Sequence, residues 1–288
     1  MLTQFRAVLP ELRVHSWGGF GSQLFTAYVI LKAKKRYPGR RLKVVIHTSG
    51  VTRRVSEFDF EKLGIKQIQV EDYKNLNIQS HSKVDSFSRH FKLFKSLKKN
   101  LSKVLKWLRV IQLANSDESF NSIMPWTLAL RGHYTRISLD TELIHCLFQL
   151  LFDKISFLTS KETELIIHYR LGDLLNLDEK SPIKPKRIEE LLLLLTYNKS
   201  KLMVLSDSSE KQFKDFVSGN TILSSLRSET LEPLPSLWLC INSDIFIGTG
   251  TKLSLWAAIF REVIDENPSF LPVELDWVKP FCRQVNWY

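Results

Sequence analysis

The sequence predicts an α/β protein with two domains, one over residues 1–158 and the other over residues 159–288. Short apolar strands alternate with helical segments in both parts of the chain, which is the pattern of a parallel sheet. A chain of 288 residues is long enough for two domains that each bury a core. With 44% hydrophobic and 25% charged residues, the composition excludes wholly disordered, collagenous and fibrous proteins.

The N-terminal elements form one βαβ unit. Residues 12–16 read as a short strand that runs into a glycine-rich turn. Residues 23–37 have the composition and periodicity of a helix, which Pro38 and Gly39 end. Residues 42–47 then read as a buried strand, so a parallel sheet begins here.

The C-terminal part repeats the strand and helix alternation, and the boundary between the domains falls near residues 153–163. Three of its strands end in small or polar residues, and a helix follows each of them. Open α/β sheets place their ligand sites at such carboxyl ends. The strands are predicted at 164–169, 201–205 and 244–247, and the helices at 185–197, 210–217 and 253–260.

The formal charge of +11 is concentrated in the first half of the chain. Residues 1–150 sum to +14 and residues 151–288 to −3, while the stretch 80–110 alone contributes +8. Within it, residues 87–110 place apolar side chains at helical spacing between lysines. This basic amphipathic segment is either a surface helix packed on the core or a peripheral contact with anionic membrane headgroups. Nucleic acid is not expected as a partner, because no stacking-aromatic pattern accompanies the charge.

Other features indicate a protein of the cytoplasm, either free or on the inner face of the membrane. The three cysteines are widely spaced, which argues against a disulfide framework and against a metal site. The first twenty residues lack the apolar stretch of a signal peptide. The longest apolar runs are too short to span a bilayer.

Three short runs carry the residue types of a phosphate site. The run Gly18-Gly19-Phe20-Gly21-Ser22 follows a strand and opens a helix, so its backbone amides could approach a phosphate. The spacing is not that of a dinucleotide fold, and a plain tight turn explains the run equally well.

The second run, from His168 to Asp173, reads HYRLGD at a predicted strand end. An arginine beside a glycine at this place suits bidentate contact with a diphosphate. The alternative is an ion pair between Arg170 and Asp173 that closes a turn.

The third run, Gly248-Thr249-Gly250-Thr251-Lys252-Leu253-Ser254, offers hydroxyl groups, backbone amides and a cation at a helix start. These groups can cradle a phosphate, although the Walker spacing is absent. A generic helix start with Thr251 as N-cap is the alternative.

Taken together, these runs resemble the GDP-fucose-dependent fucosyltransferase superfamily, and most closely the bacterial α-1,2-fucosyltransferases of glycosyltransferase family 11. The similar stretches are GGFGSQLF, HYRLGD, LSDS at 205–208, and LWLCINSDIFIGTGTKLSLWAA, in the family's order. The resemblance implies two Rossmann-like domains facing across a cleft, in the GT-B arrangement. It also implies inverting, metal-independent transfer of fucose from GDP-fucose to a galactoside hydroxyl in surface glycan synthesis, on a free or lipid-linked glycan acceptor.

The resemblance also assigns roles to individual residues. Arg170 would contact the β-phosphate of the donor, with His168 and Asp173 shaping the same strand end. Asp207 would bind the guanine or the ribose. The remaining positions would let the N-terminal loop close on the nucleotide or would hold phosphate oxygens: Gly19, Gly21, Ser22, Thr249, Thr251 and Ser254.

The chain departs from the family pattern at three positions. Ser22 replaces an asparagine, Leu171 replaces a common second arginine, and Lys252 interrupts a run rich in serine and threonine. Two alternatives follow from these departures. One is the same fold with another nucleotide-sugar donor, and the other is a non-catalytic protein that binds a nucleotide or a glycan.

Overall fold

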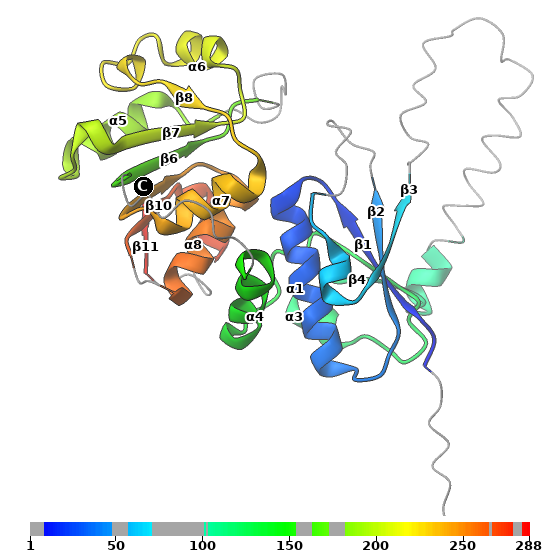
Figure 1. The fold of residues 1–288 in the computed structure, drawn as a ribbon. Coiled ribbons are helices and arrows are strands. Elements are labelled where there is room, and N and C mark those ends of the chain that lie inside the picture. The colour runs from blue at the N-terminus through cyan, green and yellow to red at the C-terminus, as the bar shows by residue number, and fades with distance from the viewer. Residues whose placement is uncertain are drawn as a thin grey trace, which may run out of the picture. The chain divides into compact units, whose positions relative to one another are not determined.

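The computed structural model describes residues 9–47, 57–70, 101, 103–153, 163–172, 182–264, 267–278 and 284–288. The chain divides into two compact units, Met1–Ser138 and Leu139–Tyr288, which we call unit 1 and unit 2. In each unit a parallel sheet is covered by helices (Figure 1). The predicted α/β class with two Rossmann-like units is therefore confirmed, and their arrangement across a cleft stays a prediction.

Unit 1 is built on a parallel sheet in the order β3-β2-β1-β5-β4. The predicted βαβ unit is present, and the edge strands beyond it are short. The strands are β1 (Leu12–Trp17), β2 (Leu42–His47), β3 (Lys66–Val70), β4 (Ile111–Leu113) and β5 (Ala129–Arg131), and the helices are α1 (Phe20–Arg36), the 3-10 turn η1 (Phe60–Leu63) and α3 (Asp117–Asn121).

Helix α1 begins three residues before the predicted start and is buried on most sides through its first half. Polar side chains of α1 can be buried there because they have hydrogen-bond partners. Thr26 donates to the Ser16 hydroxyl at 2.9 Å, and Gln23 accepts the amides of Glu57 and Phe58 at 3.0 and 2.8 Å. The helix ends before Gly39, which has a positive φ of 83°. These contacts fix the start of α1 against the carboxyl end of β1.

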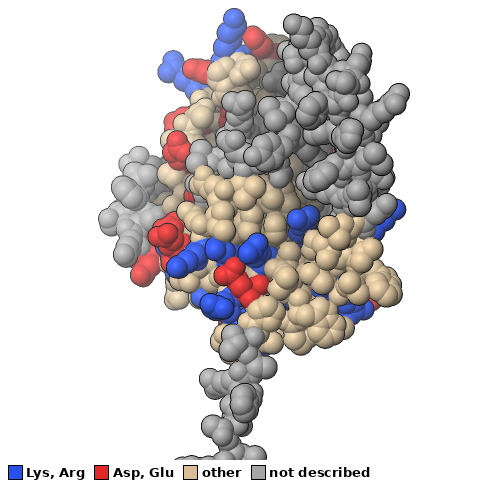
Figure 2. Space-filling view, turned by 90° about the vertical axis from the view of Figure 1, so that its right-hand side faces the viewer, with Lys and Arg blue, Asp and Glu red and all other residues tan. Residues whose placement is uncertain are grey.

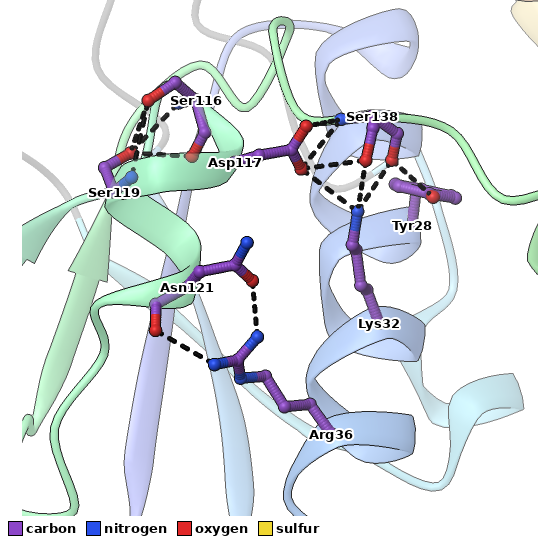
Figure 3. A network of polar contacts seen from close by, with 8 residues as sticks. All are labelled: Tyr28, Lys32, Arg36, Ser116, Asp117, Ser119, Asn121 and Ser138. Carbon is purple, nitrogen blue, oxygen red and sulfur yellow. Dashed lines mark hydrogen bonds and ion pairs between the residues drawn. The ribbon is translucent and has the colours of Figure 1, made fainter.

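A polar network joins α1 to α3 and to Ser138, the last residue of unit 1 (Figure 3). Lys32 donates to the Ser138 carbonyl at 2.8 Å and pairs with Asp117 at 3.2 Å. Asp117 in turn accepts the Ser138 amide at 3.0 Å, and Tyr28 donates to the Ser138 carbonyl at 2.8 Å. The chain is thus anchored to α1 at the point where it leaves unit 1.

Unit 2 has a six-stranded parallel sheet in the order β11-β10-β9-β6-β7-β8. Strand β6 lies in the middle, and all five of its residues are buried. The three predicted strands and three predicted helices are present, with boundaries shifted by a few residues. The strands are β6 (Leu165–Tyr169), β7 (Leu202–Ser206), β8 (Ser228–Glu229), β9 (Ile245–Gly248), β10 (Ser269–Leu271) and β11 (Val285–Trp287), and the helices are α4 (Thr141–Phe152), α5 (Pro185–Leu194), α6 (Glu210–Val217), α7 (Pro233–Asn242) and α8 (Lys252–Ile264), with 3-10 turns η4 (Lys199–Lys201), η5 (Leu223–Ser225) and η6 (Val273–Val278).

Arg261 on α8 is fully buried and ties three segments of unit 2 together. Its guanidinium donates to the carbonyl groups of Cys240 and Ile241 at the end of α7, at 3.0 and 2.9 Å. It also donates to the Asp244 and Pro268 carbonyls, both at 3.0 Å. The C-terminal end of a helix has carbonyl groups without intrahelical partners and carries partial negative charge. The Arg261 cation therefore has two roles at the end of α7: it donates hydrogen bonds to these carbonyl groups and stabilises the negative end of the helix dipole.

The division between the units falls at Ser138 and Leu139, earlier than the predicted boundary at residue 158. The difference concerns α4, which packs on unit 2. Its Phe148 and Phe152 contact Trp238 of α7 and Phe260 of α8, with ring centroids between 4.9 and 6.4 Å apart. The aromatic cluster therefore places α4 in the second unit.

Most of the predicted basic amphipathic segment, residues 80–100, lies outside the described residues. Its C-terminal end is helical at Leu101 and over residues 103–107. Leu101, Val104 and Trp107 are exposed there, whereas Leu105 is half-buried. Across the described parts of the chain, no helix has both the length and the apolar character needed to cross a membrane.

Candidate functional site

The chain order of unit 2 reverses direction across its sheet between β6 and β9. Strands β7 and β8 follow β6 on one side, whereas β9, β10 and β11 lie on the other. In an open α/β sheet, ligands bind outside the carboxyl ends of the strands at such a switch point. His168 near the end of β6 pairs with Gly248 at the end of β9, and both HYRLGD and GTGTKLS begin here. Two of the three predicted runs therefore meet at the topological switch point.

Thr249 joins the two strand ends directly. Its hydroxyl donates to the His168 carbonyl at 3.0 Å and accepts the Arg170 amide at 3.1 Å. Its own amide also donates to the His168 carbonyl, at 3.2 Å. These bonds fix the backbone of Arg170 relative to the loop between β9 and α8.

The start of α8 is closed by a second hydroxyl group. Thr251 accepts the Ser254 amide at 3.0 Å, which makes Thr251 the N-cap of α8. The Thr251 hydroxyl donates to Ser254 Oγ at 3.1 Å, and Ser254 Oγ lies 2.7 Å from His168 Nδ1. The hydroxyl groups of Thr249, Thr251 and Ser254 are buried and hydrogen-bonded within the protein, so their first role is to shape the loop.

His168 is a neutral ring at neutral pH. Burial lowers its pKa from 6.5 to about 4; the Asp207 carboxylate opposes this shift and the Arg170 cation adds to it. A neutral imidazole beside Ser254 can position that hydroxyl, but at pH 7 it is not the imidazolium form that acts as a general acid towards a leaving group. The geometry favours a positioning role for His168.

Asp207, which follows β7, organises the backbone after Arg170. Its Oδ1 accepts the amides of Leu171 and Gly172 at 2.8 and 2.9 Å, and its Oδ2 lies 3.7 Å from Arg170 Nε. A Cβ atom on Gly172 would lie 2.8 Å from Asp207 Oδ2 and 3.0 Å from its carbonyl oxygen, so the residue at position 172 must be glycine. Arg170 therefore forms an ion pair with Asp207, and the alternative pair with Asp173 stays a prediction, because Asp173 lies outside the described residues.

The Arg170 side chain is partly exposed at this strand end, and its backbone amide is bonded to Thr249 in the loop that leads into α8. A guanidinium can hold two oxygens of a phosphate at once, and a helix N-terminus favours negative charge. Gly250 in the loop has open space where its Cβ would be, since no atom of the described residues other than its chain neighbours lies within 4 Å. Together these groups could hold a diphosphate through one cation, a helix dipole and a closely approaching backbone.

The glycine-rich run of unit 1 is closed by a carboxylate. Gly19 is the N-cap of α1, and the Phe20 amide donates to Glu57 Oε2. Gly18 has a positive φ of 90°, which favours glycine at this turn. An anion at a helix N-terminus is stabilised by the helix dipole. A carboxylate of the protein therefore occupies the place where the sequence suggested that a phosphate could approach.

One cluster at the carboxyl edge of the unit 1 sheet was not predicted. His15 Nδ1 and His47 Nε2 lie 2.8 Å apart, and Trp17 stacks on His47 with 4.3 Å between ring centroids. Trp17 and His47 are register partners on β1 and β2. The signal was available in the sequence, since His15 lies in the first predicted strand, Trp17 directly follows it, and His47 ends the second. The cluster adds polar and aromatic groups to this sheet edge.

The predicted site residues fall into two groups. Unit 2 brings together His168, Arg170, Asp207, Thr249, Thr251 and Ser254, and unit 1 holds Gly19, Gly21 and Ser22 at the start of α1. Asp173 lies outside the described residues. Leu171 is buried in the core of unit 2 and offers no phosphate contact. Within the described ranges, no group of three metal-ligating side chains is present.

No protein-family model matches the chain, and no curated protein matches it. Among solved structures, it is similar to the E. coli heptosyltransferase WaaC with ADP (12% identity, covering 96% of this chain and 92% of that one, TM-score 0.44). It is also similar to a family 9 glycosyl transferase from Veillonella parvula (11%, 98% and 86%, 0.45). A third similar structure is the NodZ α-1,6-fucosyltransferase soaked with GDP-fucose (15%, 86% and 92%, 0.41).

Proposed function

We propose that the protein is a glycosyltransferase that takes its sugar from a nucleoside-diphosphate donor. The observation that carries this proposal is the position of Arg170, held at the switch point of unit 2 by Thr249 and Asp207. The sequence resemblance makes GDP-fucose the donor, and a galactoside hydroxyl the acceptor, in an α-1,2 linkage. The acceptor would be a glycan or a lipid-linked glycan of surface polysaccharide synthesis, modified at the cytoplasmic side of the membrane.

In the proposed reaction, the acceptor hydroxyl oxygen attacks the anomeric carbon as the bond from that carbon to the β-phosphate oxygen breaks, and the hydroxyl proton is released to solvent. Negative charge then develops on the departing nucleoside diphosphate. Arg170 and the N-terminal end of α8 would stabilise this charge, and such stabilisation is often the largest contribution to catalysis. Attack from the face opposite the leaving group inverts the anomeric centre. No metal ion is assigned to this step.

A second candidate keeps the fold and changes the ligand. Leu171 is buried where the resembled family often has a second arginine, so the site has one phosphate-binding cation fewer. The hydroxyl groups of Thr249, Thr251 and Ser254 are already hydrogen-bonded within the protein. Both observations favour another donor, or a protein that binds a nucleotide sugar without transferring it.

A ligand screen separates these candidates. A ligand that binds only the folded protein raises its melting temperature, so GDP, UDP and ADP can be ranked by thermal shift. Transfer from GDP-fucose to galactosides is then measured by mass spectrometry of the acceptor. Stabilisation by GDP with transfer supports the first candidate, and stabilisation by a different nucleotide supports another donor. Stabilisation by GDP-fucose with neither transfer nor hydrolysis supports the binding protein.

Arg170→Ala is expected to reduce donor binding and transfer together. Removal of one well-placed charge-stabilising donor costs about 3–4 kcal/mol, or roughly 10²–10³ in kcat. The matched control is Arg227→Ala, because Arg227 is an exposed arginine of the same unit and away from the strand end. Both variants are compared by GDP thermal shift and by steady-state kinetics. Normal turnover in Arg170→Ala would remove the phosphate contact from the proposal.

A further inference from the structure

Unit 1 carries a group of exposed apolar and basic side chains at the described end of the basic segment. We call it the Trp107 surface. On the helical turns at 101 and 103–107 and just after them, apolar and cationic residues alternate. The surface comprises Leu101, Lys103, Val104, Lys106, Trp107, Leu108, Arg109 and Trp126. Figure 2 shows a face of the molecule on which blue Lys and Arg side chains lie among broad tan areas, with some red Asp and Glu side chains beside them.

Two chain segments are fastened together to form this surface. Trp126 Nε1 donates to the Leu108 carbonyl at 3.0 Å, and Thr127 Oγ1 donates to the Arg109 carbonyl at 2.8 Å. The Leu128 amide donates to the Val110 carbonyl at 2.8 Å. These bonds hold the end of the helical turns against the chain that enters β5. Trp107 and Trp126 are therefore parts of one fixed surface.

The exposure of these side chains is unusual for their type. Trp107 is 82% exposed and Trp126 is 54% exposed, and Leu101, Val104 and Leu108 are also exposed. Scattered exposed apolar residues are ordinary, but a contiguous group of this kind marks a site of interaction. Burying a large apolar side chain contributes roughly 1.5–3 kcal/mol, so a partner that covers Trp107 gains substantially.

The charges around the apolar side chains of the Trp107 surface indicate which kind of partner it binds. Residues 101–116 include three basic residues and no acidic one. Tryptophan and leucine beside lysine and arginine fit the boundary between acyl chains and anionic headgroups of a bilayer. A second copy of the chain would bring Lys103, Lys106 and Arg109 against the same cations. A nucleic acid duplex would leave the exposed Trp107 without an apolar partner.

We propose that the Trp107 surface docks the protein on an anionic lipid bilayer, with Trp107 and the leucines at the headgroup boundary and the lysines on the headgroups. The test is co-sedimentation of the full chain with vesicles of phosphatidylcholine alone or mixed with phosphatidylglycerol. The protein is expected to bind the mixed vesicles and to be released by salt, since the electrostatic part is screened.

Trp107→Ser is expected to weaken vesicle binding by about tenfold or more, because the main apolar anchor is lost. Its matched control is Leu194→Ser at the end of α5, where the side chain is 83% exposed. Both substitutions remove an exposed apolar side chain, so both variants should keep the melting temperature of the parent. Equal vesicle binding by Trp107→Ser and the parent protein would overturn the proposal.

The charge contribution is tested with a pair of double variants of equal net charge. The double substitution Lys103→Glu with Lys106→Glu is expected to lower binding by at least about fivefold for each lysine. The control is Lys199→Glu with Lys201→Glu, two exposed lysines of unit 2. An equal loss in both would show that bulk charge, and not this surface, drives binding.

Three other outcomes would also contradict the proposal. One is binding to neutral and anionic vesicles alike, or to neither. Another is concentration-dependent self-association that Trp107→Ser abolishes, which would make a second copy the partner. The third is tight duplex binding lost in the same lysine variant, which would make nucleic acid the partner. Vesicle binding does not require the nucleotide-sugar donor. The vesicle experiments therefore test this proposal independently of whether the protein transfers a sugar.

Discussion

His168 is a buried imidazole whose neutral form the fold requires. Its ring contacts the Ser254 hydroxyl, and burial moves its pKa from 6.5 to about 4. The unfolded chain takes up a proton near pH 6.5, whereas the folded protein does not until about pH 4. The associated stability is therefore fully present above pH 6.5 and is lost as the pH falls from 6.5 towards 4.

We expect the free energy of unfolding to fall by about 2 kcal/mol between pH 7 and pH 5 because of this one group. His168→Asn keeps a polar atom near the position of Nδ1 and cannot be protonated, so its loss over the same range should be smaller by about that amount. Urea unfolding of both proteins at the two pH values measures the difference. Equal pH dependence in the parent and the variant would show that His168 is not the group responsible.

Single residues of the candidate site were predictable where the groups that define them are neighbours in the sequence. Arg170 and Gly172 were singled out because a strand and its polar end are adjacent in the chain. The contact between Asp207 and the Leu171 and Gly172 amides was not predicted, because it joins the ends of two neighbouring strands. The two amides are already bonded to Asp207, so its carboxylate has a structural task besides the predicted contact with guanine or ribose.

The loop between β9 and α8 combines fixed and open positions. A Cβ atom on Gly248 would lie 2.6 Å from the Cβ of Ser254, so glycine is required there by the packing of α8. Among the described residues, apart from its chain neighbours, a Cβ atom on Gly250 would meet no atom within 4 Å. The space at Gly250 is therefore available to a ligand that approaches the loop backbone.

Gly250→Ala is expected to leave the melting temperature unchanged and to weaken GDP binding by about tenfold, because the added methyl group would meet the phosphate. Gly219→Ala is the matched control, since Gly219 is exposed and also has no protein atom within 4 Å of its Cβ position. Calorimetric titration with GDP compares the two variants with the parent. Unchanged GDP affinity in Gly250→Ala would place the phosphates elsewhere.

Elements with strong local signals were predicted well. The bounds of α6 match the predicted helix, because Ser209 and Gln212 form a capping box and Phe213 and Val217 lie on one face. The strands β3, β4, β5, β8, β10 and β11 were not predicted, and all of them except β3 have three residues or fewer, which is too few for a periodic pattern. Their pairing depends on neighbours that are distant in sequence, such as β1 beside β5.

At the scale of the whole molecule, the place of α4 can be tested with two fragments. Residues 139–288 keep α4, whereas residues 159–288 lose it and expose Trp238 and Phe260. Four residues of α4 are buried, including Leu147 and Phe152, so its loss should cost at least about 3 kcal/mol. Urea unfolding followed by circular dichroism measures both fragments. Equal stability would move the boundary back to residue 158.

The distribution of charge follows the two units. The excess of basic residues belongs to the first half of the chain, where the Trp107 surface lies, and the half with the candidate diphosphate site is slightly acidic. In the proposed function, one arginine and a helix terminus then bind the anion, without help from the net charge of this half of the chain. The net charge is thus connected with the proposed membrane docking of the protein more than with the binding of the diphosphate.

The guanidinium of Arg261 also has a consequence for the order in which unit 2 assembles. Its acceptors come from the end of α7, from the chain before β9 and from the chain before β10. An intermediate that docks α8 before these segments arrive would hold a dehydrated cation without its acceptors, which is costly. Partly assembled states that bury Arg261 without these acceptors are therefore raised in free energy, which favours cooperative assembly of this part of unit 2.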